Sequence, residues 1–213
     1  MNHDSTSPTE NVAQRRTIPS DEDLLAQFLD GDERSFVDLM GRYKEPILSF
    51  IYRFLGDYDD ATDIAQETFV RLYRFGHTFK GEVKFSTWLY TIAANLSRSE
   101  LKRYRRRNGT TLKDAFRKGE DDETWDVPDE TYRPDDRVDS TRIAQEVQQA
   151  LMRISPSYRE MVILRDIQQM TYEEIAVVTE TELGTVKSRI NRGRQQLQRE
   201  LQGLYDELFG SAA

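Results

Sequence analysis

Apolar side chains in the first half of the chain recur every three or four residues, which is the spacing of one face of an α-helix. Gly31 and Gly56 interrupt this pattern, and a loop around residues 76–84 separates its last two runs. No stretch alternates apolar and polar residues for long enough to indicate a strand. The pattern predicts about four helices that share one core, with the apolar positions Leu24, Leu25, Phe28, Leu29, Phe36, Leu39, Met40, Tyr43, Ile47, Leu48, Ile51, Leu55, Ile64, Phe69, Leu72, Tyr73, Trp88, Leu89, Ile92, Ala93, Leu96 and Leu101.

Capping residues predict where several helices begin. Either Asp59 or Asp60 can cap the third helix, and Ser155 followed by Pro156 predicts a later start, because serine caps a helix and proline fits its first turn. The residues Thr171-Tyr172-Glu173-Glu174 have the spacing of a capping box. After a short turn at 179–181 we expect one long last helix, with the buried stripe Leu183, Val186, Ile190, Leu197, Leu201, Leu204 and Leu208.

Composition divides the chain into four parts. Residues 1–20 are polar and lack periodicity, which predicts a flexible tail, and residues 109–136 are acidic and contain Pro128 and Pro134, which predicts a linker. The helical patterns occupy residues 21–108 and 137–209. The predicted fold class is therefore all-α, with two helical domains joined by an acidic flexible linker, the second domain being a helix-turn-helix.

Charge is distributed unevenly along the chain. The net charge is −8, which at first disfavours a nucleic-acid partner. Residues 119–139 contain ten acids and two arginines, a net of −8, so this one segment accounts for the whole excess. Two basic patches flank it: residues 98–107 carry a net +5, and residues 187–199 carry five cations and no acid. This arrangement restores nucleic acid as a candidate partner.

The composition also excludes several kinds of chemistry. The chain has no cysteine and two histidines, so disulfides and thiolate metal sites are excluded, and we expect neither metal nor cofactor. The longest purely apolar runs are only a few residues, and the N-terminal residues contain no apolar signal segment. We expect a cytoplasmic protein without membrane insertion.

Two helices joined by a tight turn, the second apolar on one side and cationic on the other, indicate a helix-turn-helix with a recognition helix. The alternative is a solvated basic face on a bundle helix. Reading a major groove requires exposed donors and small polar groups near the start of the helix, whereas cations further round suit phosphates. The candidates for base contact are Thr185, Lys187, Ser188, Asn191 and Arg192, and those for phosphate contact are Arg189 and Arg194.

Three segments resemble one protein family. The run GTVKSRINRGR at 184–194, preceded by YEEIA, resembles the C-terminal promoter-reading domain of bacterial sigma factors of the extracytoplasmic-function group, within the sigma-70 family. The run DATDIAQETFVRLYR at 60–74 is similar to the family's polymerase-binding helix, and FKGEVKFSTWLYTIAANLSRSELKRYRRR at 79–107 to its DNA-melting segment. The resemblance covers roughly residues 21–108 and 139–208.

The resemblance implies an initiation subunit that is not itself an enzyme. Such a subunit binds core RNA polymerase, reads the minus-35 promoter element and melts the minus-10 element. It implies contacts with the clamp helices of the largest polymerase subunit and with the flap region, and a possible anti-sigma factor. It also implies that the acidic linker threads toward the polymerase active centre, although a solvated tether is the simpler interpretation of this segment.

Residue roles follow from the matched segments. The polymerase-binding candidates are Asp63, Gln66, Glu67 and Val70, which lie within about a turn of one another; without the resemblance, an ordinary solvated acidic face is the simpler interpretation. The minus-10 candidates are Phe79, Lys84, Trp88, Asn95, Arg98, Lys102 and Arg103. Among the aromatic residues, Phe85 and Trp88 are better explained as core residues that shape the loop.

Two positions depart from the family pattern. Glu180 stands where the turn commonly has glycine, and Glu182 stands where the reading helix often begins with proline.

Two other classes of function also remain open. A transcription regulator that needs no polymerase would bind duplex DNA by itself, and a recombinase would require a nucleophile ringed by arginines, for which the first half shows no catalytic pattern.

Overall fold

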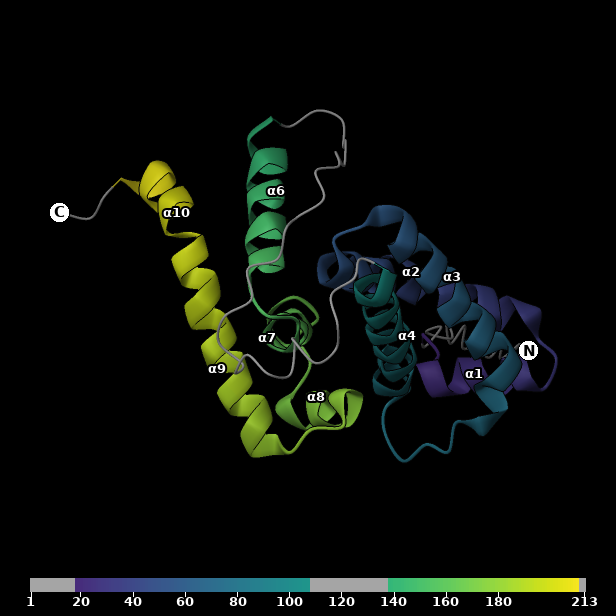
Figure 1. The fold of residues 1–213 in the computed structure, drawn as a ribbon. Helices are drawn as coiled ribbons and strands as arrows, with labels where there is room; N and C mark the ends of the chain where they lie inside the picture. The colour runs from purple at the N-terminus through teal and green to yellow at the C-terminus, as the bar shows by residue number, and fades with distance from the viewer. Residues whose placement is uncertain (1–17, 108–137, 211–213) are drawn as a thin grey trace, which may run out of the picture.

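The computed structural model describes residues 18–107 and 138–210, and every regular element within these ranges is helical (Figure 1). The predicted N-terminal tail and acidic linker lie outside the described residues. The elements are α1 (Asp21–Leu29), α2 (Glu33–Leu55), α3 (Tyr58–Phe75), η1 (Gly76–Thr78), α4 (Phe85–Arg107), α6 (Val138–Arg153), α7 (Pro156–Val162), η2 (Ile163–Ile167), α8 (Tyr172–Thr179), α9 (Leu183–Glu200) and α10 (Gln202–Phe209).

The first four helices enclose most of the core that the spacing of apolar residues predicted, but Leu29 and Tyr73 are exposed, which corrects that prediction at two positions. The long helix α2 packs against α1, α3 and α4, and α3 also packs against α4. Side chains from each helix meet inside and exclude water, which is the main favourable contribution to folding. The most deeply buried of them are Leu39, Ile47, Phe50, Ile51, Leu72, Phe85 and Leu89.

Local sequence explains where these helices start and stop. Gly56 ends α2 in the left-handed conformation, with φ of 85°, which only glycine adopts without strain. The expectation that Asp59 or Asp60 caps α3 is wrong, because the capping residue is Asp57, whose carboxylate accepts the Asp60 N–H at 2.7 Å. Asp59 and Asp60 instead lie in the first turn, where negative charges interact favourably with the positive end of the helix dipole.

The C-terminal helices are built around the contact between α7 and α9. Pro156 occupies the first turn of α7, as predicted, but the Ser155 side chain makes no capping hydrogen bond. Gly193 lies where α9 crosses α7, and a Cβ atom there would stand 2.7 Å from Cγ2 of Val162 and 3.2 Å from Cβ of Tyr158. The glycine therefore permits a close approach of the two helices.

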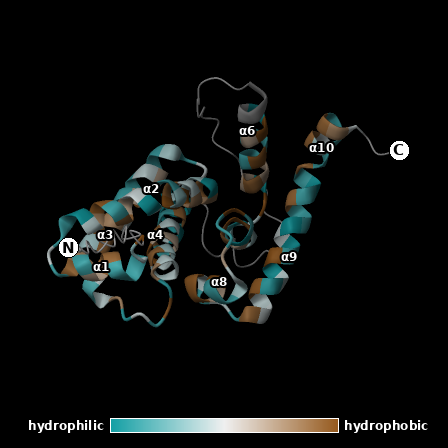
Figure 2. Cartoon of the chain, turned by 180° about the vertical axis from the view of Figure 1, so that it is seen from behind, coloured by the Kyte–Doolittle hydropathy of each residue, from teal (hydrophilic) through white to brown (hydrophobic). Residues whose placement is uncertain are grey.

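The expectation of one long last helix with a continuous buried stripe is wrong. The chain breaks at Leu201, between α9 and α10, and both Leu183 and Leu208 are exposed. Burial is deepest at Val186 and Ile190, because α9 packs on α7 and α8 there while its ends lie beyond that contact. Figure 2 shows the hydrophilic residues that cover much of α9.

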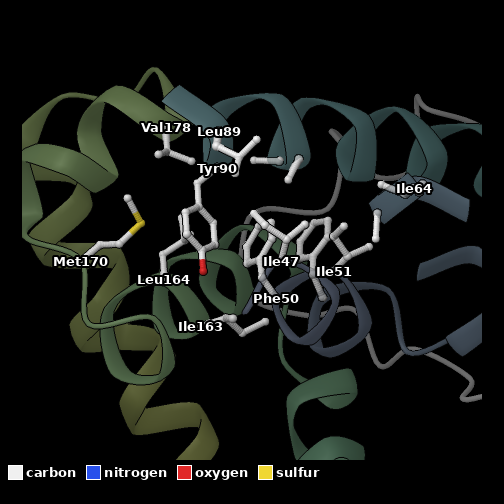
Figure 3. Packing of buried hydrophobic residues seen from close by; sticks show 14 of the residues in the cluster. Ile47, Phe50, Ile51, Ile64, Leu89, Tyr90, Ile163, Leu164, Met170 and Val178 are labelled. Atoms are coloured by element: carbon white, nitrogen blue, oxygen red, sulfur yellow. The ribbon is translucent and has the colours of Figure 1, made fainter. Parts of the chain in front are cut away.

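The two halves of the chain pack directly against each other, which the sequence did not predict. Helix α4 contacts α8, and α2 contacts α6, α7 and η2. Their buried residues form one continuous cluster, in which Tyr90 and Phe50 of the first half lie beside Leu164 and Met170 of the second (Figure 3). Within the described ranges the two predicted domains therefore share a core.

Candidate nucleic-acid interface

Helix α8, a tight turn and helix α9 form a helix-turn-helix. The predicted capping box is present: the Thr171 N–H donates to Oε2 of Glu174 at 2.7 Å, and the Glu174 N–H donates to Oγ1 of Thr171 at 3.2 Å. After α8 the Thr181 N–H donates to the carbonyl of Ala176 at 3.0 Å, and the Glu180 N–H to that of Val177 at 3.3 Å. This pattern is a Schellman motif, which satisfies the last carbonyls of the helix.

Glu180 occupies the left-handed position of that motif, with φ of 51°. A side chain in this conformation crowds its own backbone, at a cost of about 1 kcal/mol relative to glycine. We therefore expect Glu180→Gly to raise the free energy of unfolding by about 1 kcal/mol, measured by urea denaturation. Glu180→Ala removes the same carboxylate but keeps a Cβ atom, so it should give no comparable gain; an equal gain would assign the effect to charge.

Helix α9 presents one apolar and one polar face. Val186 and Ile190 are 0% and 1% exposed, and they hold the helix against α7 and α8. The opposite face carries the exposed side chains Lys187, Ser188, Asn191 and Arg192. An amide, a hydroxyl and two cations presented side by side on a helix match the donor and acceptor pattern of a major groove.

The remaining residues predicted for this face are more enclosed or already bonded. Thr185 and Arg189 are half-buried. On the exposed face, the Ser188 hydroxyl donates to the Thr185 backbone carbonyl at 2.9 Å. Arg194 is exposed but donates through Nε and Nη2 to the carboxylate of Asp166 at 2.9 and 2.5 Å. This bidentate pair orients the guanidinium beside the reading face.

Next to this face lies a cluster of two cations and one aromatic ring that was not predicted from the sequence. The Arg165 guanidinium lies 4.8 Å from the centre of the Tyr172 ring, and Nζ of Lys187 lies 6.0 Å from the same centre. Arg165 also donates to the Met170 carbonyl at 2.7 Å. A ring attracts a cation over its face, so Tyr172 helps to place Lys187. No sequence signal joins these residues, because they come from three different elements.

The loop before α4 and the start of that helix carry an aromatic cluster. Phe79 lies 5.6 Å from Trp88 and 6.1 Å from Phe85, measured between ring centres. Phe85 is fully buried, as predicted, whereas Phe79 and Trp88 are half-buried and pack against the core. Two of the three rings therefore keep part of their surface accessible, as base stacking requires.

The polar candidates on α4 divide into two groups. Lys102 and Arg103 are exposed near the end of the helix, where Arg103 pairs with Glu100 at 3.0 Å. Arg98 instead contacts the second half of the chain, since its Nη1 lies 2.6 Å from Oε1 of Glu160. Asn95 is exposed, and its Oδ1 accepts a hydrogen bond from Nη2 of Arg98 at 2.5 Å.

Lys84 and Arg98 both bind carboxylates of the second half, and the environment shifts the pKa of these carboxyls. Nζ of Lys84 lies 2.8 Å from Oε1 of Glu174. Burial raises the pKa of the Glu160 carboxyl, although Arg98 opposes this effect. Burial also favours a higher pKa for the Glu174 carboxyl, but hydrogen bonds from Lys84 and from the Thr171 backbone outweigh it and lower that pKa.

The buried guanidinium of Arg159 joins the two halves at a third point. It donates to the Phe54 carbonyl at 2.7 Å and to the carbonyls of Met152 and Ile154 at 2.8 and 3.2 Å. Burial, with repulsion from Arg105, lowers the pKa of Arg159 to about 9, so the group stays charged at neutral pH. Arg159 therefore bonds the last turn of α2 to the residues before α7.

A separate surface lies on α3. Asp63, Gln66, Glu67 and Val70 are all exposed on one side of that helix, as the sequence predicted. A groove of about 620 Å³ runs beside them between α2 and α3, and most of its lining is apolar. The lining includes Phe36, Met40, Leu48, Phe69 and Tyr73 together with Gln66 and Val70. This surface therefore combines carboxylates with an accessible apolar cleft, which suits a partner protein.

Comparison with known families assigns both halves of the chain. Residues 39–107 match sigma-70 region 2, and residues 144–197 match sigma-70 region 4. The ECF RNA polymerase sigma factor SigW of Bacillus subtilis is 35% identical over 182 residues, which cover 84% of this chain and 96% of that one. The chain belongs to the extracytoplasmic-function (ECF) group of the sigma-70 family. It is a sigma factor that directs promoter-specific transcription initiation.

Other relatives agree with this assignment. The RNA polymerase sigma-H factor of Pseudomonas aeruginosa is 34% identical over 90% of this sigma factor and 98% of its own length. The ECF RNA polymerase sigma-E factor of Escherichia coli K12 is 31% identical over 87% of this sigma factor and 96% of its own length.

Two solved structures share the fold of this sigma factor. RpoE of Bartonella quintana, in complex with the anti-sigma factor NepR, gives a TM-score of 0.63 at 23% identity and covers 79% of this chain and 98% of its own. CnrH, in complex with the cytosolic domain of CnrY, gives a TM-score of 0.62 at 24% identity and covers 87% of this chain and 99% of its own. In the part of this sigma factor that the structure describes, no helix is long and apolar enough to cross a membrane, and no group of three or more histidines, aspartates or glutamates could hold a metal ion.

Proposed function

We propose that this sigma factor reads the minus-35 element through the exposed face of α9. Lys187, Ser188, Asn191 and Arg192 supply the base contacts, and Thr185, Arg189 and Arg194 support them at the edges of the groove. The supporting observation is the opposition between this polar face and the fully buried Val186 and Ile190. An exposed donor surface on a helix held rigidly from behind is suited to insertion into a major groove.

The minus-10 element is proposed to bind the region from Phe79 to Arg107. Phe79 and Trp88 provide the accessible ring surface on which an unstacked base can lie, and Asn95 provides an amide for a base edge. Lys84, Arg98, Lys102 and Arg103 hold the backbone of the separated strand. Their spacing along α4 and the preceding loop supports binding of a single strand along the helix.

The surface of α3 with its groove is proposed to bind core RNA polymerase. Asp63 and Glu67 attract cations of the clamp helices of the largest subunit, while Gln66 and Val70 border the apolar groove. The flap region is proposed to bind the C-terminal half.

Residues 21–108 and 137–209 are proposed to form the two functional domains. The polymerase supplies the catalytic chemistry, so this chain catalyses no reaction and acts in the cytoplasm with the polymerase and DNA.

An anti-sigma factor is a further proposed partner. The RpoE and CnrH structures were both solved as complexes, the first with the anti-sigma factor NepR and the second with the cytosolic domain of CnrY. Their shared fold supports a comparable partner for this chain, because an inhibitor must recognise the surfaces that the fold presents.

Gel-shift assays with core polymerase test these assignments. Promoter duplex should shift with the purified chain and core polymerase together, and weakly with the chain alone, because Lys84 and Arg98 of the proposed minus-10 region are paired with carboxylates of the C-terminal half in the isolated chain. A strong shift by the chain alone, unchanged by polymerase, would indicate an ordinary DNA-binding regulator and contradict the proposal.

A further inference from the structure

The start of α4 is capped by a side chain from another helix. Lys84 precedes the first turn, and its carbonyl accepts the Trp88 N–H at 3.1 Å, but its ammonium group cannot accept a hydrogen bond from the helix. The Phe85 N–H, at the first position of α4, donates instead to Oε1 of Glu22 at 3.0 Å. Glu22 belongs to α1 and lies 63 residues earlier in the chain. Its carboxylate therefore takes the place of a local capping residue.

Two neighbouring acids at the start of α1 reach two different helices. Oδ1 of Asp21 lies 2.6 Å from Nη1 of Arg42, and the Tyr43 hydroxyl also donates to the Asp21 carboxylate, so this residue fixes α1 to α2. Glu22, the next residue, reaches α4. Consecutive side chains on a helix point about 100° apart. One turn of α1 can therefore hold two neighbouring helices at once.

Helix α1 also supports the other end of the loop before α4. It packs against η1, and a Cβ atom added at Gly76 would lie 3.1 Å from Cδ1 of Leu25. Leu24 and Leu25 are 1% and 3% exposed, so burial of apolar surface holds α1 in place. The loop at 79–84 therefore runs between two points that α1 contacts.

Glu22 can act on the proposed base-stacking surface through Phe85. Phe85 is fully buried, and its ring centre lies 5.5 Å from that of Tyr43 and 6.1 Å from those of Phe79 and Trp88. Phe79 and Trp88 are the half-buried rings of this cluster. A hydrogen bond that fixes the Phe85 backbone therefore also fixes the support on which both accessible rings rest.

We propose that Glu22 is a positioning residue for promoter melting, whose carboxylate holds the first turn of α4 so that Phe79 and Trp88 form a stacking surface before DNA arrives. This proposal rests on the proposed function of the region from Phe79 to Arg107. Glu22 touches no base and acts only through the Phe85 N–H. A base that meets a preformed surface does not have to order it, so less of the binding energy is lost.

Two substitutions of Glu22 in the full-length chain test whether the hydrogen bond matters. Glu22→Ala removes the acceptor, whereas Glu22→Gln keeps an acceptor oxygen at the same reach. Asp23→Ala is the matched control, because this carboxylate lies in the same turn but accepts the Ser20 N–H within the capping box of α1. Each chain is combined with core polymerase on a promoter that the wild-type chain transcribes. Fluorescence of 2-aminopurine in the minus-10 element measures the rate of opening.

We expect Glu22→Ala to slow opening about tenfold, because the uncapped first turn of α4 is in its competent form only part of the time. Glu22→Gln and Asp23→Ala should each stay within about threefold of wild type, since both leave α4 with an acceptor at its start. On a template already unpaired across the minus-10 element, transcription by Glu22→Ala should also stay within about threefold, because the strand no longer has to be captured from a duplex. A general loss of stability would affect both templates equally.

Opening by Glu22→Ala at the wild-type rate, or an equal loss with Glu22→Gln or Asp23→Ala, overturns the proposal. An equal defect on the paired and unpaired templates overturns it too. The double variant Phe79→Ala with Trp88→Ala separates this failure from that of the proposed function. If opening is slow without the two rings but normal in Glu22→Ala, only the positioning role fails; if opening is normal without the rings, the proposed minus-10 site fails as well.

Discussion

Replacing Asn191 and Arg192 together by alanine is expected to reduce transcription from a minus-35-dependent promoter by about thirtyfold or more. Both side chains are exposed on the reading face of α9, opposite the buried Val186 and Ile190. A well-formed base contact contributes about 1–3 kcal/mol, and loss of two such contacts gives at least about 2 kcal/mol. Run-off transcription with core polymerase at fixed salt measures the effect.

The control for this variant lies on the same helix. Gln195→Ala with Arg199→Ala also removes one amide and one cation, and both residues are exposed beyond the reading face. We expect transcription to fall by less than about threefold in the control, since only distant phosphate attraction is reduced. Equal losses in the two double variants would contradict base reading by Asn191 and Arg192 and leave a non-specific charge effect.

The second large effect is expected at the polymerase surface. Val70 borders the groove between α2 and α3 and is 40% exposed. Val70→Asp places a charge where an apolar partner surface must dock, and loss of a central contact of this kind costs about 2 kcal/mol or more. Affinity for core polymerase should therefore fall by about thirtyfold or more, as measured by biolayer interferometry.

Val37→Asp is the matched control for this substitution. Val37 is 64% exposed on α2 and is not among the groove residues. Both variants should fold normally, because surface substitutions usually change stability by less than about 0.5 kcal/mol. Similar affinities for the two variants would exclude the groove from the polymerase contact.

Much of the local structure was predictable from the sequence, because it depends on nearby residues. Helical spacing located most core positions of α2 and α3, although Tyr73 is exposed, and the same spacing left Asp63 and Val70 on the outer side of α3, where the structure has them. The capping box at Thr171 was predictable from four consecutive residues. Glu180 was recognised as a departure from the family pattern, and its φ of 51° explains why glycine is favoured there.

The contact between the halves was not predictable in the same way. Charged residues are expected at the surface, so Arg159 and Glu160 carried no signal that they would be buried. Their partners, the Phe54 carbonyl and Arg98, are more than sixty residues away along the chain. The sequence identified Lys84 and Arg98 as cations suited to DNA, but not that each would meet a carboxylate of the other half. Such pairings depend on tertiary packing, which leaves no periodic pattern.

Run-off transcription by purified core polymerase, on fragments of the source genome and with or without this chain, tests the central claim most directly. The account predicts specific transcripts only when both components are present. It also predicts their loss with Asn191→Ala and Arg192→Ala but not with Gln195→Ala and Arg199→Ala. Core polymerase that gains no start site from the wild-type chain would contradict the account.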